Sequence, residues 1–477
     1  MSPSAIALSI IFGIVAIGSG IGFYAGARYK MDLEQWTVAG RGFGLLFVWL
    51  LMAGEIYTTF AFLGASGWAY SQGGPTLYIL AYLTLAYVVS FYILPPVWEF
   101  ARRHALQTEA DFFQSRYGNK YLSGLVALVG VVFMIPYLQL QLTGLGIIVE
   151  AASFGAVGRT PAMLISFTLV AAFVFASGVR AVAWVSVLKD FLLLSAAVII
   201  GIAVPRIYFG GVGAMFTALE HARPAHLTMP GATTNHGHAW FITTVLLTSL
   251  GFYMWPQALG STFTAKSSDT LRRNAVIMPL YGITLPLIFI VGFTALLVLP
   301  PLKNGDLALL TIVRNTFPAW FLGLIGGAGA LTAMVPAAIQ ILAAAALFAK
   351  NLYRPVFAPQ MSDHQVTRLA RVMVLVITGI ALYFAIYSSS TLVSLLLLGY
   401  AGVTQFFPGI VLGLFSRRVT AGGVFAGLVV GVVIVAALML SNHDPVFGLN
   451  AGFVALCCNF LIVALVSLSR TRQPAPQ

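Results

Sequence analysis

Thirteen long apolar runs decide what this chain can fold into. A helix needs about 20 predominantly apolar residues to cross the hydrocarbon core of a bilayer, and the runs approach or exceed that length. Hydrophobic residues make up 60% of the 477 residues and charged residues only 8%, whereas soluble domains have about 25% charged residues. The sequence therefore predicts an all-α integral membrane protein with thirteen transmembrane helices. The runs lie at roughly 5–27, 44–70, 77–97, 123–149, 161–178, 182–205, 238–264, 275–299, 318–349, 368–388, 391–415, 421–440 and 448–468.

The basic residues are divided unevenly between the loops. Most of the 25 Lys and Arg residues fall in the loops that follow odd-numbered runs and in the C-terminal tail. Loops rich in Lys and Arg stay on the cytoplasmic side of a membrane. This distribution predicts a multi-pass protein with its N-terminus outside and its C-terminus inside the cell. The net charge of +12 follows largely from this bias, so no nucleic-acid partner is expected.

Two of the runs are interrupted at membrane depth. Gly54 and Glu55 stand in the middle of the second run, and Gly251 and Pro256 in the seventh. Irregular backbone at this depth is tolerated where it is buried or lines a cavity, and paired broken helices are typical of transporters built from inverted repeats. The alternative is simple packing, since Gly and Pro are common in membrane helices.

The spacing of the interruptions predicts how the single transmembrane domain is organised. The two interrupted runs are five apart, which suggests one five-helix repeat at about 44–205 and a second at about 238–415. The runs at about 5–27, 421–440 and 448–468 would then lie outside this 5+5 core. In the ninth run, Pro336 is expected to bend the helix, because proline removes one backbone hydrogen bond.

Three ionisable residues fall inside apolar runs. Glu55 is at the first interruption, and Lys189 and Asp190 lie near the start of the sixth run. Such residues are expensive in a membrane and are candidates for function. The alternatives are that Lys189 reaches back to the headgroups and that Glu55 only ties down unwound backbone. Asp190 points about 100° away from Lys189 around a helix, so we expect it to pair with a loop arginine instead.

Five motifs occur in order along the chain. They are WTVAGRGFG (36–44), FLGASGWAYSQGG (62–74), IPYLQLQLTGLG (135–146), MWPQALGSTFTAKSSDTLRRNA (254–275) and AGVTQFFPGIVLGLF (401–415). Together they resemble the sodium:solute symporter family, and the tract around 254–275 most resembles the bacterial monocarboxylate permeases of that family. The resemblance implies a leucine-transporter-type fold with one extra N-terminal and two extra C-terminal helices, in a bacterial inner membrane. It also implies uptake of a small monocarboxylate of the acetate, propionate, pyruvate and lactate class.

The resemblance also implies where relatives bind sodium. Backbone carbonyls matching Ala53 and Ile56 would face the ion, and the ninth run would add one carbonyl and two hydroxyls. Those last three positions match Thr332, Val335 and Pro336, so both hydroxyls are missing. Sodium without these oxygens would be poorly solvated.

The sixth run departs from the family pattern in a complementary way. The usual Asp and Gln are replaced by Ser186 and Lys189. We expect the Lys189 ammonium to lie near the Ala53 or Ile56 carbonyl in place of sodium, and to release its proton during transport. The sequence therefore predicts a proton-coupled, sodium-independent carrier in which Lys189, Glu55, Asp190 and Ser186 take part in coupling. The alternative is a sodium-coupled symporter of another small organic solute.

The residues beside the two interruptions are the substrate candidates. They offer hydroxyl, amide and aromatic groups, although aromatic side chains at helical spacing more often pack than bind ligands. The uncharged stretch at 76–93 argues against a polyol substrate. The sequence shows no H-E-x-x-H set or comparable nucleophile, so no enzyme activity, metal or cofactor is expected, and Cys457 and Cys458 are expected to be small core residues. The substrate candidates are Tyr57, Thr58, Thr59, Tyr253, Trp255, Gln257 and Gln405.

Overall fold

The computed structural model describes residues 1–26, 38–176, 179–233 and 235–469. Within these ranges the chain is helical, and the only strand-like pairings are two isolated bridges, one of them between Phe43 and Ala265. The elements are α1 (Pro3–Gly26), α3 (Leu45–Ile56), η2 (Phe60–Gly64), α4 (Ala65–Ser71), α5 (Tyr78–Arg103), α6 (Glu109–Tyr117), α7 (Lys120–Ala152), α8 (Arg159–Ala176), α9 (Val179–Phe209), α10 (Val212–Ala222), α11 (His238–Gly251), α12 (Pro256–Thr262), α13 (Ser268–Ile277), α14 (Pro279–Gly282), α15 (Thr284–Val298), η5 (Gly305–Leu307), α16 (Ala308–Thr316), α17 (Ala319–Ala346), η6 (Leu347–Tyr353), α18 (Arg354–Phe357), α19 (Asp363–Tyr387), α20 (Leu392–Val403), η7 (Thr404–Phe406), α21 (Phe407–Phe415), α22 (Ala421–Leu440) and α23 (Ala451–Ser469).

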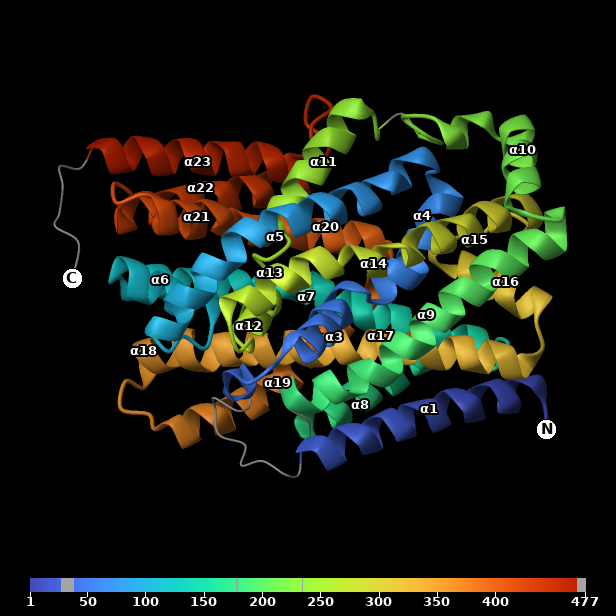
Figure 1. The fold of residues 1–477 in the computed structure, drawn as a ribbon, viewed down its shortest axis with the longest axis horizontal. Coiled ribbons are helices and arrows are strands. Elements are labelled where there is room, and N and C mark those ends of the chain that lie inside the picture. The colour runs from blue at the N-terminus through green and yellow to red at the C-terminus, as the bar shows by residue number, and fades with distance from the viewer. Residues whose placement is uncertain (27–37, 177–178, 234, 470–477) are drawn as a thin grey trace.

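The long helices run roughly along one axis of the molecule (Figure 1). Within the described residues, ten helices are long and apolar enough to cross a membrane, and the bent pair of α3 with η2 and α4 brings the number to eleven. Two further apolar helices, at Arg159–Val174 and His238–Gly251, are shorter. The expected count of thirteen is therefore not confirmed, because two of the predicted runs form helices that are too short by themselves.

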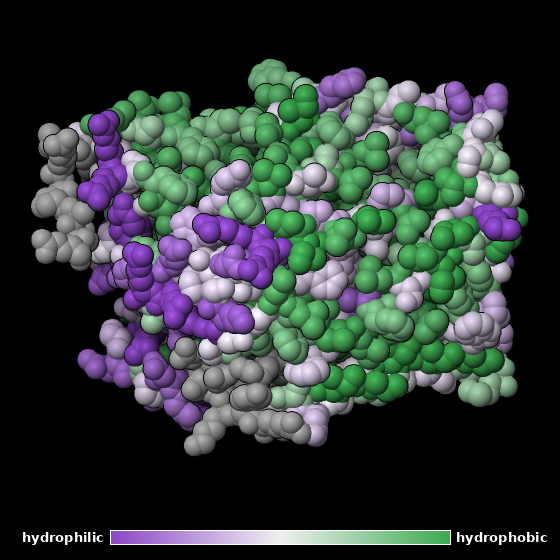
Figure 2. Space-filling model, in the orientation of Figure 1, coloured by the Kyte–Doolittle hydropathy of each residue, from purple (hydrophilic) through white to green (hydrophobic). Residues whose placement is uncertain are grey.

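One end of the bundle is basic, and we call it the basic end. Figure 2 shows hydrophilic residues gathered at the left of this view, while most of the visible face to the right is apolar. The ends of α5 and α21, together with α6, α18 and the start of α19, lie at this end (Figure 1). The basic end carries the exposed side chains of Arg102, Arg103, Arg368, Arg371, Arg417 and Arg418.

Both predicted interruptions are present. The helices at Leu45–Ile56 and Phe60–Ser71 meet at a bend of 58°, and the stretch 252–255 between α11 and α12 is not helical. The first break falls at Tyr57 and Thr58, a few residues beyond the predicted Gly54, which remains helical. Gly54 instead lets α3 approach α9, since a Cβ there would lie 2.8 Å from Ser186 Oγ.

The expected bend at Pro336 does not interrupt α17. This helix runs through Pro336 without a break from Ala319 to Ala346 and is buried along most of its length. It packs on α1, α7 and α9, and this packing outweighs the single backbone hydrogen bond that proline removes. The regular α-helix gives way only at η6, a π-helical segment near the basic end.

The first and last helices flank the broken ones. Helix α1 packs along α17 and α9, and α22 and α23 pack against each other. The expectation that the two cysteines lie in the core is wrong: Cys457 is exposed and Cys458 is only partly buried.

Candidate functional site

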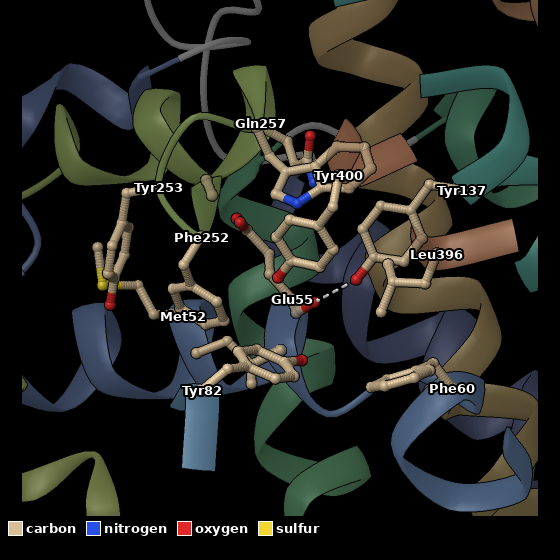
Figure 3. A pocket seen from close by; sticks show the side chains of 13 residues that line it. Met52, Glu55, Phe60, Tyr82, Tyr137, Phe252, Tyr253, Gln257, Leu396 and Tyr400 are labelled. Atoms are coloured by element: carbon tan, nitrogen blue, oxygen red, sulfur yellow. Dashed lines mark hydrogen bonds between the residues drawn. The ribbon is translucent and has the colours of Figure 1, made fainter. Parts of the chain in front are cut away.

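A cavity lies where the two broken helices meet. Its volume is about 20 Å³, which leaves room for about one water molecule in this conformation. Figure 3 shows its lining side chains converging from several elements, with the Glu55 side chain in their midst. We call it the central cavity. It is lined by Met52, Glu55, Ile56, Phe60, Tyr82, Tyr137, Phe252, Tyr253, Trp255, Gln257, Ala258, Leu396 and Tyr400.

Glu55 joins the two breaks. Its side chain is only about 5% exposed, and its carboxylate accepts a hydrogen bond from the Ser261 hydroxyl on α12. The Tyr137 hydroxyl donates to the Glu55 backbone carbonyl across 3.1 Å, as the dashed line in Figure 3 shows. This carbonyl lies one turn from the end of α3, where backbone acceptors lose their helical partners. Glu55 therefore connects α3, α7 and α12 at the cavity.

Aromatic rings form one wall of the central cavity. The Trp255 ring lies 4.7 Å from that of Tyr137 and 5.2 Å from that of Tyr400, centroid to centroid. Trp255 fits because residue 399 is glycine: a Cβ there would lie 2.3 Å from the indole. Beside this wall, Gln257 Oε1 is buried and has no hydrogen-bond partner among the described residues. The cavity thus combines apolar surface with an unpaired amide oxygen and a carboxylate.

Three of the substrate candidates line the central cavity, and four do not. Tyr253, Trp255 and Gln257 are on its surface. The Tyr57 ring instead stacks on Tyr281, with centroids 3.9 Å apart. Gln405 donates to the Ala401 and Gly452 carbonyls and so ties α20 to α23.

Thr58 and Thr59 serve the first break itself. The Thr58 hydroxyl accepts a hydrogen bond from the Phe60 N–H across 3.1 Å. The Thr59 hydroxyl donates to Gln141 Oε1 on α7 across 2.8 Å. Both hydroxyls therefore have partners that replace lost helical hydrogen bonds or fix the half-helix that follows.

Several cavity residues were missed in the sequence. Tyr82, Tyr137 and Tyr400 come from α5, α7 and α20, none of which is broken next to them. Tyr137 follows Pro136, and Tyr400 precedes the helix irregularity at η7. These irregularities were the available signals, but a tyrosine in a membrane helix is equally typical of packing.

The region that matches the sodium site of relatives contains apolar side chains and hydroxyl groups that already have hydrogen-bond partners. Val335 Cγ1 lies 3.5 Å from a Cβ built on Gly54, so α17 and α3 meet there. The Thr332 hydroxyl donates to the Ala328 carbonyl across 2.7 Å, within its own helix. Ser186 likewise donates to the Val182 carbonyl across 3.0 Å. Neither hydroxyl is directed at α3 by its hydrogen bond.

Lys189 occupies the space beside the first break. Its side chain is fully buried, which excludes the alternative that it reaches the headgroups. Its Nζ donates to the Tyr57 carbonyl across 3.3 Å, one residue beyond the expected Ala53 and Ile56. Those two carbonyls already accept from backbone N–H groups of residues 57 and 58. The Tyr57 carbonyl is thus the next one in the chain that faces the amine.

The expectation for Asp190 is wrong. Its Oδ1 lies 2.8 Å from Lys189 Nζ, so the two neighbours form a buried ion pair instead of pairing with a loop arginine. The long, flexible lysine stem overcomes the angle of about 100° between successive side chains. The Tyr281 hydroxyl also donates to Asp190 Oδ1, across 2.9 Å. Tyr281 in turn stacks on Tyr57, which closes a ring of contacts around the first break.

Similar proteins share the fold over nearly the whole chain. The structure matches that of a Na⁺-coupled sialic acid symporter with a TM-score of 0.82 over 99% of this chain and 98% of the other, at 18% identity. It matches a nucleobase-cation-symport-1 family transporter less closely, with a TM-score of 0.58 over 91% of this chain and 92% of the other, at 14% identity. The architecture is therefore that of the leucine-transporter-like carriers.

The sequence comparisons name the family. The chain is 44% identical to the uncharacterized symporter YhjB of Bacillus subtilis, over 97% of this chain and 96% of that protein. It is 27% identical to a monocarboxylate transport permease protein of Rhizobium johnstonii, over 98% and 97% of the two chains. The model of the sodium:solute symporter family matches residues 36–431. This membrane transport protein belongs to the sodium:solute symporter family.

Proposed function

We propose that this protein takes up small monocarboxylates together with protons and without sodium. The observation that carries the coupling proposal is the buried Lys189 ammonium at the Tyr57 carbonyl. It lies beside the first break, where α9 and α17 both pack on α3. In this proposal the ammonium performs the structural task that sodium performs in relatives.

The side chains around the break support replacement of the ion. Sodium is a hard cation that needs several oxygen ligands, and α17 presents Val335 and Pro336 at the matching positions. An ammonium needs fewer acceptors, and Lys189 has two, from Tyr57 and Asp190. A positive charge at this place links the broken helix α3 to α9 without any ion from solution.

Glu55 is the group that we assign to proton binding. Lys189 is not among the described residues that line the central cavity, whereas Glu55 is. The Glu55 carboxylate has a single hydroxyl partner, Ser261, and the cavity gives this carboxylate a route for proton exchange. We therefore revise the expectation that Lys189 itself releases the proton. In this proposal Lys189 remains paired with Asp190, and Glu55 binds and releases the transported proton.

The lining of the central cavity supports a small, partly apolar substrate, for which the two broken helices would move apart. Its aromatic wall suits a short alkyl tail, and Tyr253, Trp255 and Gln257 bring polar atoms to the same surface. Protonation of Glu55 would remove the negative charge that opposes a bound carboxylate. A carboxylate and a proton moving together carry no net charge, so uptake is expected to respond to the pH gradient and little to voltage.

The movement that opens this site is proposed to follow the two repeats. Repeat one at about 44–205 contains the break after α3, and repeat two at about 238–415 contains the break after α11. Rocking of broken helices against a scaffold is the usual route to alternating access in such folds. Loss of the Lys189 contact to Tyr57 would free the first break to move.

The second candidate is a sodium-coupled symporter of another small organic solute. Relatives that favour it include a sodium/proline symporter of Haemophilus influenzae, at 23% identity over 98% of this chain and 95% of that protein. In that case sodium would be held elsewhere in the structure.

Transport by the purified protein in liposomes tests the proposal. Labelled acetate, propionate, pyruvate and lactate should exchange by counterflow, and an inward pH gradient in sodium-free buffer should drive their accumulation. If proline competes while none of the monocarboxylates does, the substrate assignment fails. If accumulation follows a sodium gradient at fixed pH, the coupling assignment fails.

A further inference from the structure

A second cavity, which we call the lower cavity, contains a buried carboxylate without a partner. Its volume is about 30 Å³, room for about one or two water molecules, and it is lined by residues of α6, α12, α17 and η6 with Val179 of α9. Glu109, the first residue of α6, lines it and is fully buried. Neither carboxylate oxygen of Glu109 has a hydrogen-bond partner among the described residues. Buried polar groups are nearly always paired, so this one needs an explanation.

Glu109 is not needed to cap its helix. Thr108 and Asp111 form the complete capping box of α6, with each side chain accepting from the other residue's backbone N–H. Asp111 also binds Lys350 of η6 across 2.7 Å. The structural tasks at this helix end are therefore carried by other residues.

The charged groups around Glu109 are engaged elsewhere. Lys350 is held by Asp111 and Gln107, and Arg116 of α6 donates to the Gly413 carbonyl. Helices α12 and α21, which also pack on α6, have no titratable side chain, and Lys120 at the start of α7 is exposed. Burial, with no countercharge among the residues that the structure describes, raises the pKa of Glu109 well above its usual range.

The lower cavity and the central cavity adjoin each other across α12. Gln257 lines both of them. Ser261 lines the lower cavity and donates its hydroxyl hydrogen to Glu55, which lines the central cavity. A path of polar groups thus leads from Glu55 through Ser261 into the space that Glu109 faces.

We propose that Glu109 is a second proton-binding site, which receives the transported proton from Glu55 and releases it at the basic end. Ser261 accepts the proton from the Glu55 carboxyl and passes its own hydroxyl proton to water in the lower cavity. That water protonates the Glu109 carboxylate, so that Glu55 becomes ionised as Glu109 becomes neutral. The proposal rests on the proposed function, in which Glu55 carries the proton.

The relay gives a reason for the unpaired Glu109 carboxylate to lie beside the proposed path of an anionic substrate. A charged Glu109 would repel a carboxylate that passes the lower cavity, whereas a protonated one would not. Arrival of the proton and passage of the substrate would then be linked at this second site.

The test compares net uptake with exchange in the variant Glu109→Gln. Exchange of labelled for unlabelled substrate needs no net proton release, so it should stay within about twofold of the unaltered protein. Net accumulation driven by a pH gradient should fall at least tenfold. Glu109→Asp, which keeps an acid at this position, should recover part of the loss. Glu99→Gln is the matched control, because Glu99 is exposed near the end of α5 and its variant should behave like the unaltered protein.

Three results would overturn the relay. Normal net uptake by Glu109→Gln would show that no proton passes through this residue, and equal loss of uptake and exchange would show a structural role. Loss of function in Glu99→Gln would show that the effect is not specific. If the unaltered protein is driven by sodium and not by pH, the proposed function fails together with the relay; if it is driven by pH and Glu109→Gln is normal, only the relay fails. Thermal unfolding checks folding: Glu109→Gln should melt higher than the unaltered protein at pH 8, where ionisation of Glu109 costs stability.

Discussion

At the scale of single residues, Lys189 and Asp190 matter most. A buried ion pair adds little net stability, because the loss of hydration offsets the attraction, but removal of one partner leaves an uncompensated charge. Lys189 is fully buried, and the Asp190 side chain is about 3% exposed. Asp190 therefore supplies the countercharge for the buried lysine beside the first break.

The pair can be tested by a double-mutant cycle. Lys189→Gln and Asp190→Asn should each destabilise the purified protein by about 3–5 kcal/mol, as is usual when one half of a buried pair is removed. The double variant should recover much of that loss and still fail to accumulate substrate, since the link to Tyr57 is gone. Thermal unfolding and uptake of all three proteins measure this. Additive losses of stability would show that the two side chains do not interact.

Gly399 offers a test of the cavity wall. Gly399→Ala should push Trp255 toward the central cavity, because the new Cβ would lie 2.3 Å from the indole. We expect the KM for substrate to rise at least several-fold while the protein remains folded. The matched control is Gly379→Ala on α19, where a Cβ would meet nothing within 4 Å. Equal transport by both variants would place the substrate away from Trp255.

At the scale of elements, η5 holds the second half of the structure to the first. The Leu392 N–H at the start of α20 donates to Asp306 Oδ2 across 3.0 Å. Gly67 of α4 lies so close that a Cβ there would be 2.8 Å from the Asp306 nitrogen. Asp306 thus fixes the half-helix after the first break relative to α20, which contributes Leu396 and Tyr400 to the cavity.

The burial of Asp306 should make stability depend on pH. Burial raises the pKa of Asp306 to about 6, so between about pH 4 and 6 the folded protein binds more protons than the unfolded chain. The contribution of Asp306 to stability is therefore greatest at low pH and is lost as the pH rises through about 6. In the variant Asp306→Asn, the melting temperature should depend less on pH in this range. An unchanged pH profile would contradict the assignment.

The sequence predicted the positions of helices and breaks better than the contacts between side chains. The two breaks were predicted from Gly54 and Glu55 and from Gly251 and Pro256, because such residues are costly inside an apolar helix, although the first break falls at Tyr57 and Thr58. The continuity of α17 could not be foreseen, since it depends on how tightly neighbouring helices enclose Pro336. The Lys189–Asp190 pair was also missed, because helix geometry gives the direction of a side chain and not the path of a long, flexible one.

The cavity was only partly predictable for a related reason. Tyr253, Trp255 and Gln257 lie at the second break, and for that reason the sequence predicted them as substrate-binding residues. Tyr82 and Tyr400 come from helices far apart in the sequence, and only the packing of α5 and α20 brings them to the same space. Conversely, Gln405 has a family-like position but is used to bind α23.

At the scale of the whole molecule, the structure suggests a direction for transport. The lower cavity, which α6 lines, lies toward the basic end (Figure 1), and we predict that this end faces the cytoplasm because exposed Arg side chains gather there. The central cavity lies between the two breaks, and the Lys189 contact holds the first of them. Substrate and proton would then leave together toward the basic end.

The most direct test is whether sodium affects substrate binding at all. The Kd of the purified protein for a monocarboxylate that it transports should be measured in sodium chloride and in choline chloride, at the same pH and ionic strength. If Lys189 takes the place of the ion, as we propose, the Kd should be the same within about twofold, and binding should tighten as the pH falls and Glu55 is protonated. A Kd at least tenfold lower in sodium, with no dependence on pH, would contradict the account.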